Sequence, residues 1–177
     1  MSKPKSVIMI GGGIQQVKAV EIAQTAGYKV IVTDRNADAP CFDYADYTAA
    51  IDGRNIENLI AYTLMNKEKF NITGIFTLTE LVTSVAAVAK ACDLPGVSLK
   101  SAVSCQNKAL CKSIWLKDNI ATPKGRVIKS LKEGKLLFNE LNEQAFVKPL
   151  VGFGGIGSSK IVSEKDIEKL FYGDNGS

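Results

Sequence analysis

The stretch AFVKPLVGFGGIGSSKIV, Ala145–Val162, decides the fold of the second half of the chain. Two strand-like apolar runs flank a loop of mostly glycine and serine, which predicts an antiparallel hairpin with a glycine-rich tip. Glycine tolerates positive φ and has no side chain, so backbone N–H groups of such a tip can converge on a ligand. Together with Lys148 they would form an anion cradle suited to phosphate. A flexible tip with a solvated lysine explains the same residues, because glycine-rich turns are common.

Residues 1–98 alternate between short apolar runs and helical patterns, which predicts an α/β domain built on a parallel sheet. The runs that have the character of strands are Ser6–Ile10, Tyr28–Thr33, Tyr47–Ile51 and Gly74–Leu78. The helices expected between and after them are Ile14–Ala26, Asn55–Lys67 and Leu81–Cys92. Strand, glycine turn, helix and strand make a βαβ unit, so we expect a Rossmann-like domain.

The helix-breaking sequence Pro95–Ser98 marks the predicted domain boundary, with one domain over residues 1–98 and a second over residues 99–177. The second domain is expected to be a small α+β unit around the antiparallel glycine-rich hairpin. Its other expected elements are short helices at Ser101–Gln106 and Asn107–Asp118, a strand-like run at Thr122–Ile128, a charged helix or loop at Lys129–Asn142, and a last helix capped by Ser163 and Asp166.

A glycine turn, Gly11, Gly12 and Gly13, follows the first predicted strand directly. Gly11-x-Gly13 matches the start of the dinucleotide fingerprint, and Asp34 closes the second strand about 20 residues on, where a ribose-binding acid belongs. The third glycine position, however, holds Gln16. The turn is therefore better explained as a helix N-terminus that accepts an anion, either phosphate or carboxylate.

Glu80 has two explanations. It completes a Thr77-x-x-Glu80 capping box ahead of the predicted helix Leu81–Cys92, and that role is sufficient to account for it. It also follows the fourth predicted strand, and open α/β sheets bind ligands beyond the carboxyl ends of their strands. Glu80 is therefore also a candidate carboxylate at the mouth of a cleft.

Composition argues against several classes of function. The chain has a net charge of +4 and no basic cluster interleaved with aromatic residues, so nucleic-acid binding is not indicated. It has no histidine, which removes imidazole bases and nucleophile pairs. Its 4 cysteines form no Cys-x-x-Cys pair, so no zinc site is expected. We expect the cysteines to be reduced thiols of a cytoplasmic protein. No apolar run approaches membrane-spanning length.

Two blocks of sequence closely resemble the ATP-grasp superfamily. The run CQNKALCKSIWLKDNIATPKG, Cys105–Gly125, is similar to that family's lysine-bearing helix and the turn after it. The run FVKPLVGFGGIGSSKIV, Phe146–Val162, is similar to its Val-Lys-Pro strand and glycine-rich lid loop. The N-terminal GGG and TDRNADAP motifs are similar to the domain that precedes ATP-grasp modules, and carbamoyl-phosphate synthase large subunits and related carboxylate–amine ligases are the nearest in character.

This resemblance implies that the chain binds ATP and a small carboxylate substrate. Lys108 and Lys148 would contact the nucleotide phosphates. The residues that would fold over the β- and γ-phosphates are Gly154, Gly155, Gly157 and Ser158. The substrate side would include Gly11, Gly12, Gly13 and Glu80. In the family, ATP converts a carboxylate into an acyl phosphate, which an amine, ammonia or a thiol then attacks.

One departure from the family bears on activity. Its magnesium ligands and adenine-binding hinge lie well downstream of the lid loop, whereas this sequence ends at Ser177, one predicted helix after it. Glu164, Asp166 and Glu168 lie outside the family's motif and do not replace those ligands. Mg²⁺ is therefore expected for a complete enzyme but not for this chain. We expect the N-terminal portion of a ligase that is inactive alone and pairs with a second copy or with a complementary C-terminal chain.

Two other interpretations stay open. The first is an NAD(P)-binding module that uses Gly11, Gly13 and Asp34, which leaves the hairpin Phe146–Val162 unexplained. The second is a non-catalytic module for nucleotide sensing or assembly, whose exposed apolar surface binds a partner. Binding of NAD(H) without an effect of ATP would favour the first, and a monomer in light scattering would count against the second.

Overall fold

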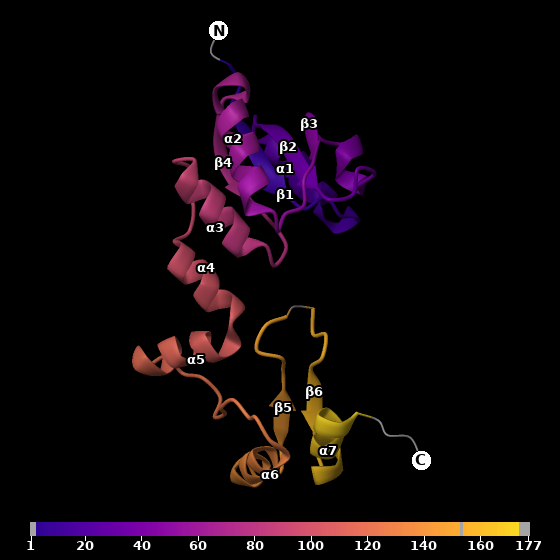
Figure 1. The fold of residues 1–177 in the computed structure, drawn as a ribbon, viewed down its shortest axis with the longest axis vertical. Coiled ribbons are helices and arrows are strands. Elements are labelled where there is room, and N and C mark those ends of the chain that lie inside the picture. Colours follow the sequence, from indigo (N-terminus) through magenta and orange to yellow (C-terminus); the bar gives the residue numbers. More distant parts are fainter. Residues whose placement is uncertain (1–2, 153, 174–177) are drawn as a thin grey trace. The chain divides into compact units, whose positions relative to one another are not determined.

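The computed structural model describes residues 3–152 and 154–173 (Figure 1). The chain divides into two compact units, Met1–Val103 and Ser104–Ser177. The division falls within α4 (Leu99–Gln106), slightly after the Pro95–Ser98 break that the sequence proposed as a boundary. The first unit is α/β with a parallel sheet and the second contains a small antiparallel sheet, so the predicted fold class is confirmed.

Unit 1 is built on a four-stranded parallel sheet in the order β3-β2-β1-β4. Its strands are β1 (Ser6–Ile10), β2 (Lys29–Asp34), β3 (Tyr47–Ala50) and β4 (Ile72–Phe76). β4 begins before the predicted Gly74, because Asn71 ends the preceding helix in a left-handed conformation (φ 50°) and the chain enters the strand directly. The strand order changes direction between β1 and β4, so the turns after these two strands flank the switch point where such sheets bind ligands.

Helices cover both faces of this sheet (Figure 1). They are η1 (Ile14–Gln16), α1 (Val17–Thr25), η2 (Pro40–Asp43), α2 (Ile56–Phe70) and α3 (Val82–Ala91). One face packs on α1 and η2 through Met9, Val20, Val30, Val32 and Cys41. The other packs on α2 and α3 through Ile8, Ile10, Ile31, Leu59, Ile72, Ile75, Val85 and Val88. Side chains alternate along a strand, so β1 and β2 supply both clusters, which explains their continuous apolar runs.

Thr33 carries an energetic cost within this core. Its side chain is fully buried, and among the described residues its Oγ1 is the buried side-chain polar atom without a hydrogen-bond partner. A buried hydroxyl without a partner loses its hydration and gains nothing in return. We expect Thr33→Val, which replaces the hydroxyl with a methyl group of similar size, to raise the free energy of unfolding by about 1 kcal/mol.

Urea denaturation of the two proteins would measure this difference. Thr63→Val is the matched control, because Thr63 is equally buried but its Oγ1 donates a hydrogen bond to the Leu59 carbonyl at 2.7 Å. That substitution removes a bond that is made and is expected to destabilise the protein or leave it unchanged. Stabilisation by Thr63→Val together with destabilisation by Thr33→Val would contradict the explanation.

Unit 2 places two helices against the predicted hairpin. After α5 (Lys108–Lys117) come α6 (Leu131–Glu140), β5 (Ala145–Val147), β6 (Ser159–Ile161) and α7 (Glu164–Tyr172). β5 and β6 pair in antiparallel fashion, which confirms the hairpin. A small buried core of Phe138, Ile161 and Ile167 joins α6, β6 and α7. The predicted cap of the last helix is also confirmed, since Ser163 and Asp166 exchange capping-box hydrogen bonds.

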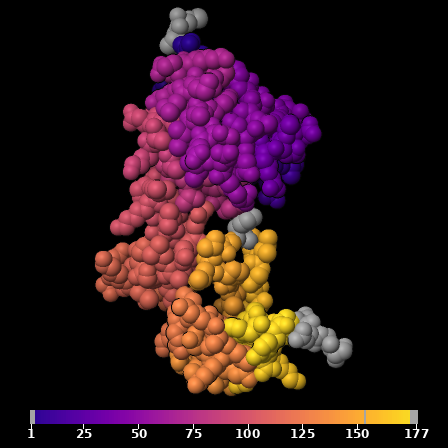
Figure 2. All heavy atoms as spheres, in the orientation of Figure 1, coloured from indigo at the N-terminus to yellow at the C-terminus, as the bar shows by residue number. Residues whose placement is uncertain are grey.

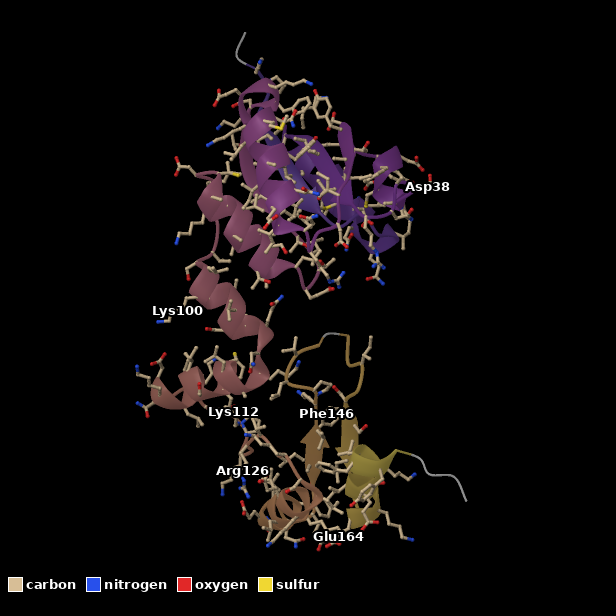
Figure 3. All side chains as sticks on the ribbon, viewed as in Figure 1. Asp38, Lys100, Lys112, Arg126, Phe146 and Glu164 are labelled. Atoms are coloured by element: carbon tan, nitrogen blue, oxygen red, sulfur yellow. The ribbon has the colours of Figure 1, made fainter. Side chains whose placement is uncertain are left out.

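The strand expected at Thr122–Ile128 was a wrong prediction, because this segment forms no strand. Pro123 has no N–H to give to a sheet, and side chains from two helices hold the segment instead. The Nζ of Lys112 donates to the Oγ1 of Thr122 at 3.2 Å and also bonds the Pro123 carbonyl (Figure 3). The guanidinium of Arg126 forms a two-pronged ion pair with Glu140 of α6. The side chains of Lys112 and Glu140 therefore hold the segment in place.

Candidate functional site

The glycine-rich loop between β5 and β6 encloses an open hollow of about 390 Å³. Its lining consists of Lys108, Phe146, Lys148, Pro149, Gly152, Gly154, Gly155, Ile156 and Ser158. The structure thus brings together the two lysines that the family resemblance implies, two of the three predicted loop glycines and the predicted serine. The third of these glycines, Gly157, lies against Pro149 at the base of the loop.

The loop needs glycine for its backbone conformation. Gly154, Gly155 and Gly157 have φ values of 64°, 76° and 71°, in the left-handed region that glycine adopts without strain. Open space surrounds the position that a Cβ would take on Gly154 or Gly155, so a ligand can approach their backbone directly. At Gly157 a Cβ would lie 2.9 Å from Cγ of Pro149, which leaves no room for a side chain. Gly154 and Gly155 therefore leave bare backbone in the hollow, and Gly157 allows the loop to pack closely against Pro149.

Lys108 is fixed to this loop although it lies on a different element. Its backbone N–H donates to the Leu150 carbonyl at 2.9 Å, and its Nζ donates to the Gly152 carbonyl at 3.0 Å. Asn107 caps α5 just before it by accepting two backbone N–H bonds. The sequence alone gave no reason to separate Lys108 from the other helix lysines, because this contact spans more than forty residues of chain.

Lys148 directly follows the last residue of β5 and lines the hollow. Its Nζ lies 5.4 Å from the centre of the Phe146 ring, within the range of a cation–π contact. Phe146 is 59% exposed, and sequence reasoning did not identify it as a site residue. Its spacing could have identified it, because Phe146 lies two residues before Lys148 and side chains two residues apart lie on the same face of an extended strand. The hollow therefore combines two ammonium groups, an exposed aromatic ring and bare glycine backbone.

In unit 1, each N–H of the glycine turn already has an acceptor within the chain. Gly11 donates to the Thr33 carbonyl at 2.8 Å and Gly12 to Oδ2 of Asp34 at 2.7 Å. Gly13 donates to Oε1 of Gln16 at 2.7 Å. Asp34 and Gln16 thus occupy positions that an anionic ligand would otherwise take, and Asp34 also accepts the N–H of Asn36. This arrangement gives no support to the interpretation of Asp34 as a ribose-binding residue.

Cys41 also holds the turn in place, and sequence reasoning did not identify it. Its N–H donates to the Gly12 carbonyl at 2.9 Å, and its Sγ lies 3.2 Å from the Gly13 carbonyl oxygen. Burial and, to a lesser extent, the nearby Asp34 carboxylate raise the pKa of the Cys41 thiol above its ordinary value. The thiol therefore stays protonated and remains a hydrogen-bond donor to the turn.

The capping box predicted for Glu80 was wrong. α3 begins at Val82 after Leu81, which provides no side-chain cap, and Thr77 instead donates to the Ile10 carbonyl at 2.7 Å. Glu80 forms an ion pair with Arg54, with 3.2 Å between Nη2 and Oε1. Arg54 was not identified from the sequence, since it follows β3 at the opposite edge of the sheet from β4.

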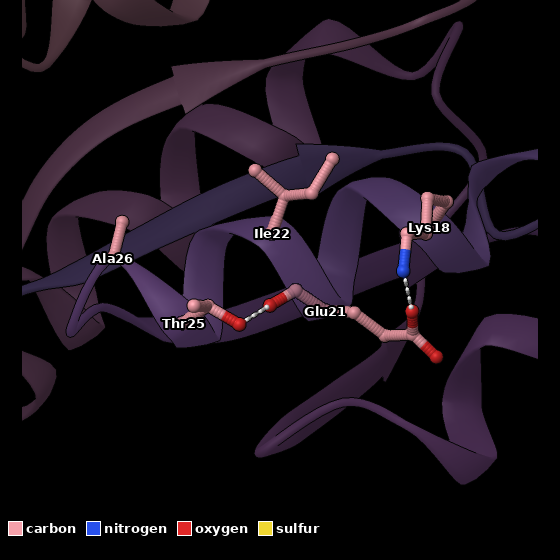
Figure 4. A pocket seen from close by; sticks show the side chains of 5 residues that line it. All are labelled: Lys18, Glu21, Ile22, Thr25 and Ala26. Carbon is pink, nitrogen blue, oxygen red and sulfur yellow. Dashed lines mark hydrogen bonds and ion pairs between the residues drawn. The ribbon is translucent and has the colours of Figure 1, made fainter.

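A second, broader hollow of about 710 Å³ runs along the outer face of α1 (Figure 4). It is lined by Lys18, Glu21, Ile22, Thr25 and Ala26. Lys18 pairs with Glu21 at 2.8 Å, and Thr25 donates to the Glu21 carbonyl, so the polar groups bond along the helix and do not converge on a common point. This hollow has the character of an ordinary helix surface.

Across residues 3–152 and 154–173, no three histidine, cysteine or acidic side chains gather as a metal site would require. Within the same ranges, no helix has both the length and the apolar character needed to cross a membrane.

Sequence comparison finds relatives of one kind. The chain is 25% identical over 173 residues to the formate-dependent phosphoribosylglycinamide formyltransferase of Methanocaldococcus jannaschii, covering 93% of this chain and 42% of that protein. It is 26% identical over 180 residues to the protein of the same name from Vibrio parahaemolyticus, covering 96% and 44%. The chain thus spans less than half the length of these relatives. No family model matches it.

Solved structures share the fold. An N5-carboxyaminoimidazole ribonucleotide synthetase in complex with ADP superposes with a TM-score of 0.79 at 20% identity, over 99% of this chain and 45% of that one. The Staphylococcus aureus N5-carboxyaminoimidazole synthetase complexed with ADP gives 0.72 at 18% identity, over 97% and 44%. An L-amino acid ligase from Bacillus licheniformis gives 0.70 at 19% identity, over 99% and 43%. These matches agree with the ATP-grasp resemblance, but they do not point specifically to carbamoyl-phosphate synthase.

Proposed function

We propose that this chain is the N-terminal, phosphate-binding part of an ATP-grasp ligase that joins a carboxylate to an amine. The hollow under the glycine-rich loop carries this proposal, because it places Lys108 and Lys148 beside backbone with no side chains. Two ammonium groups and exposed glycine N–H groups suit a polyphosphate. The solved structures that share the fold include ligases and synthetases, two of them in complex with ADP. Carbamoyl-phosphate synthesis is one reaction of this class.

In the proposed reaction the carboxylate attacks the γ-phosphorus of ATP and ADP leaves, which gives an acyl phosphate. An amine then attacks the acyl carbon and inorganic phosphate leaves. The role of this chain is to hold the phosphates and offset their charge, which is how proteins assist phosphoryl transfer. Lys148 would turn from the Phe146 ring, and Lys108 from the Gly152 carbonyl, toward phosphate oxygens.

A magnesium ion does not fit the residues of this hollow. Its lining contains two lysines and no carboxylate, whereas magnesium prefers carboxylate and phosphate oxygens. Glu164 and Glu168 are engaged elsewhere, since both pair with Lys135 of α6. We therefore assign this chain the binding of phosphates alone. Turnover would require metal ligands from outside the described residues, so we expect the chain to be inactive by itself.

The acceptor substrate would bind at the carboxyl ends of the strands in unit 1. Gly11, Gly12 and Gly13 border this edge, and Glu80 supplies a carboxylate there. The backbone N–H groups of the turn are already paired. The turn would therefore contact the substrate through its carbonyl groups and through backbone that no side chain covers. Glu80 is thus the stronger candidate for a direct charge contact with an amine.

The proposed ligase acts with a partner in the cytoplasm. The cysteines are free thiols, which suits a reducing compartment. Exposed apolar side chains in unit 2, among them Val151 and Ile156, leave surface that a second copy or a complementary chain would cover. Light scattering across a concentration series tests whether a second copy associates.

Isothermal titration with ATP tests the proposed function. We expect the wild-type chain to bind ATP and Lys148→Ala to bind it at least about tenfold more weakly, because one charge-assisted hydrogen bond to phosphate is lost. Lys165→Ala is the matched control, since Lys165 is exposed on α7 of the same unit and lies outside the hollow's lining. Equal losses in the two variants would indicate a general effect of charge, and no loss in Lys148→Ala would contradict the assigned site.

A further inference from the structure

We infer that one face of α5 is a dimer interface, on which α5 of a second copy of this chain packs in antiparallel orientation. This face, the α5 stripe, consists of Leu110, Cys111, Ile114 and Trp115. The observation behind it is that α5 buries none of its residues, whereas every other α-helix among the described residues buries at least one. The inference names a partner for the proposed ligase and does not depend on nucleotide binding.

The α5 stripe has the spacing of a single helix face. Its residues occupy positions i, i+1, i+4 and i+5, so their side chains lie side by side along the helix. Leu110 is 40% exposed and Trp115 is 41% exposed, while Cys111 and Ile114 are half-buried. A helix of a soluble protein normally packs such a face on a core, but the core of unit 2 lies on α6, β6 and α7. The stripe is therefore apolar surface outside that core.

Polar contacts hold α5 within unit 2 from a different side of the helix. Nζ of Lys108 donates to the Gly152 carbonyl, and Nζ of Lys112 donates to Oγ1 of Thr122. These two lysines are four residues apart and share one side of α5, about 110° around its axis from the centre of the stripe. The helix is thus fixed while its stripe stays exposed. A partner would meet a preformed surface and would not have to order the helix on binding.

The order of residues along the stripe makes it complementary to itself. In an antiparallel pair of α5 helices, Leu110 of each copy meets Trp115 of the other copy, and Cys111 meets Ile114. Each contact forms twice, as the twofold symmetry of a homodimer requires. Tryptophan is enriched among the residues that dominate binding energy at interfaces. The stripe therefore fits a second copy of itself.

Asp118 adds charge complementarity to the same arrangement. It ends α5 and follows Ile114 by four residues, so it continues the stripe. The helix dipole disfavours a carboxylate at a helix C-terminus, and Asp118 forms no ion pair with the residues that the structure describes. In the antiparallel pair it would lie beside the N-terminus of the other α5, where Lys108 adds a positive charge and the first turn has no acidic residue. Both ends of the interface therefore favour the second copy.

The dimer is expected to be weak. The stripe is short, and small interfaces are typical of weak complexes. Residues 104–177 also contain 12 basic and 8 acidic residues, so the whole net charge of +4 lies in unit 2 and two copies repel each other. We expect a dissociation constant on the order of 10–100 μM.

Sedimentation velocity at concentrations below, within and above this range tests the inference. We expect the mass to rise from the 19.0 kDa of one chain toward twice that value, and the emission of Trp115 to shift to shorter wavelength as its ring is covered. Leu110→Ala should weaken association at least about tenfold, because each dimer loses two leucine contacts. Leu136→Ala is the matched control, since Leu136 is also an exposed leucine but lies on α6, and it should change nothing.

Asp118→Lys separates the interface from the stability of the chain. Lysine is favourable at the C-terminus of its own helix, so the variant should unfold at the same or a higher urea concentration than the wild type. In the dimer it would bring like charges together beside Lys108, and we expect the variant to remain monomeric at every concentration. An Asp118→Lys protein that dimerises like the wild type would overturn the inference.

A cysteine-specific cross-linker about 10 Å long, similar to the distance between the axes of packed helices, checks which surface pairs. Cys111 lies in the stripe, whereas Cys105 is exposed on α4. The cross-linked dimer should form in Cys105→Ser and disappear in Cys111→Ser. Cross-linking that persists in Cys111→Ser and is lost in Cys105→Ser would assign the contact to another surface and contradict the inference.

An ATP titration of the same samples separates this inference from the proposed function. A dimer that binds no ATP would support the α5 interface and contradict the nucleotide function proposed for unit 2. A chain that binds ATP but keeps the mass of one copy at every concentration would overturn the inference and leave the phosphate site in place. The stripe would then be assigned to a complementary ligase chain.

Discussion

Gly53→Ala is expected to lower the free energy of unfolding by about 3 kcal/mol, the upper part of the range for overpacked cores. The added methyl group would lie 2.6 Å from Cγ2 of Ile10 and 2.5 Å from Cδ1 of Leu81. Leu81 can change rotamer, but Ile10 is fully buried in β1 and its branched side chain has little freedom. The strain therefore falls on the backbone of residues 52–54 or on β1 itself.

Gly74→Ala is the control for this prediction. Gly74 lies in β4, and a Cβ on it would meet Cγ1 of Val7 at 3.6 Å, an ordinary van der Waals distance. Because alanine has less freedom than glycine in the unfolded chain, that substitution is expected to be neutral or stabilising by about 0.5 kcal/mol. Urea denaturation followed by far-ultraviolet circular dichroism measures both variants. Equal stability of the two would show that the contacts at Gly53 are not restrictive.

Local signals in the sequence predicted the regular elements well. The hairpin between β5 and β6 follows from two apolar runs around a glycine loop, and the start of α7 follows from Ser163 and Asp166. The Thr77-x-x-Glu80 pattern has the same spacing yet forms no cap, because Thr77 bonds the end of β1 instead. A spacing rule cannot show that a distant carbonyl competes for the same hydroxyl.

The candidate sites depend on contacts between residues far apart in the sequence. Lys108 was suggested by family resemblance alone, and its bond to Gly152 appears only once α5 and the hairpin are folded together. Arg54 was missed because its partner, Glu80, lies after a strand at the other edge of the sheet. The pairing of Gly11 and Gly12 within the chain also depends on tertiary structure, since Thr33 and Asp34 reach them from β2.

Phe138→Ala is expected to unfold most of unit 2 and abolish ATP binding. Phe138 is one of three buried residues that form the core of this unit among the described residues, together with Ile161 and Ile167. Truncating a buried phenylalanine costs about 3–5 kcal/mol. A core in a unit of this size seldom supplies more than about 3–5 kcal/mol in total, so the loss is comparable to the stability of the whole unit.

Trp115 allows the two units to be followed separately. It is the single tryptophan of the chain and lies in α5 of unit 2, so its fluorescence reports on that unit. In Phe138→Ala we expect a tryptophan spectrum like that of an unfolded chain, and no ATP binding. Circular dichroism should still show the cooperative unfolding of unit 1, which has its own buried core and whose atoms form a continuous mass in Figure 2. Leu136→Ala on the same helix is the control, because Leu136 is 52% exposed and its truncation should leave both signals intact. A folded Phe138→Ala protein with normal ATP affinity would show that the phosphate site does not depend on this core.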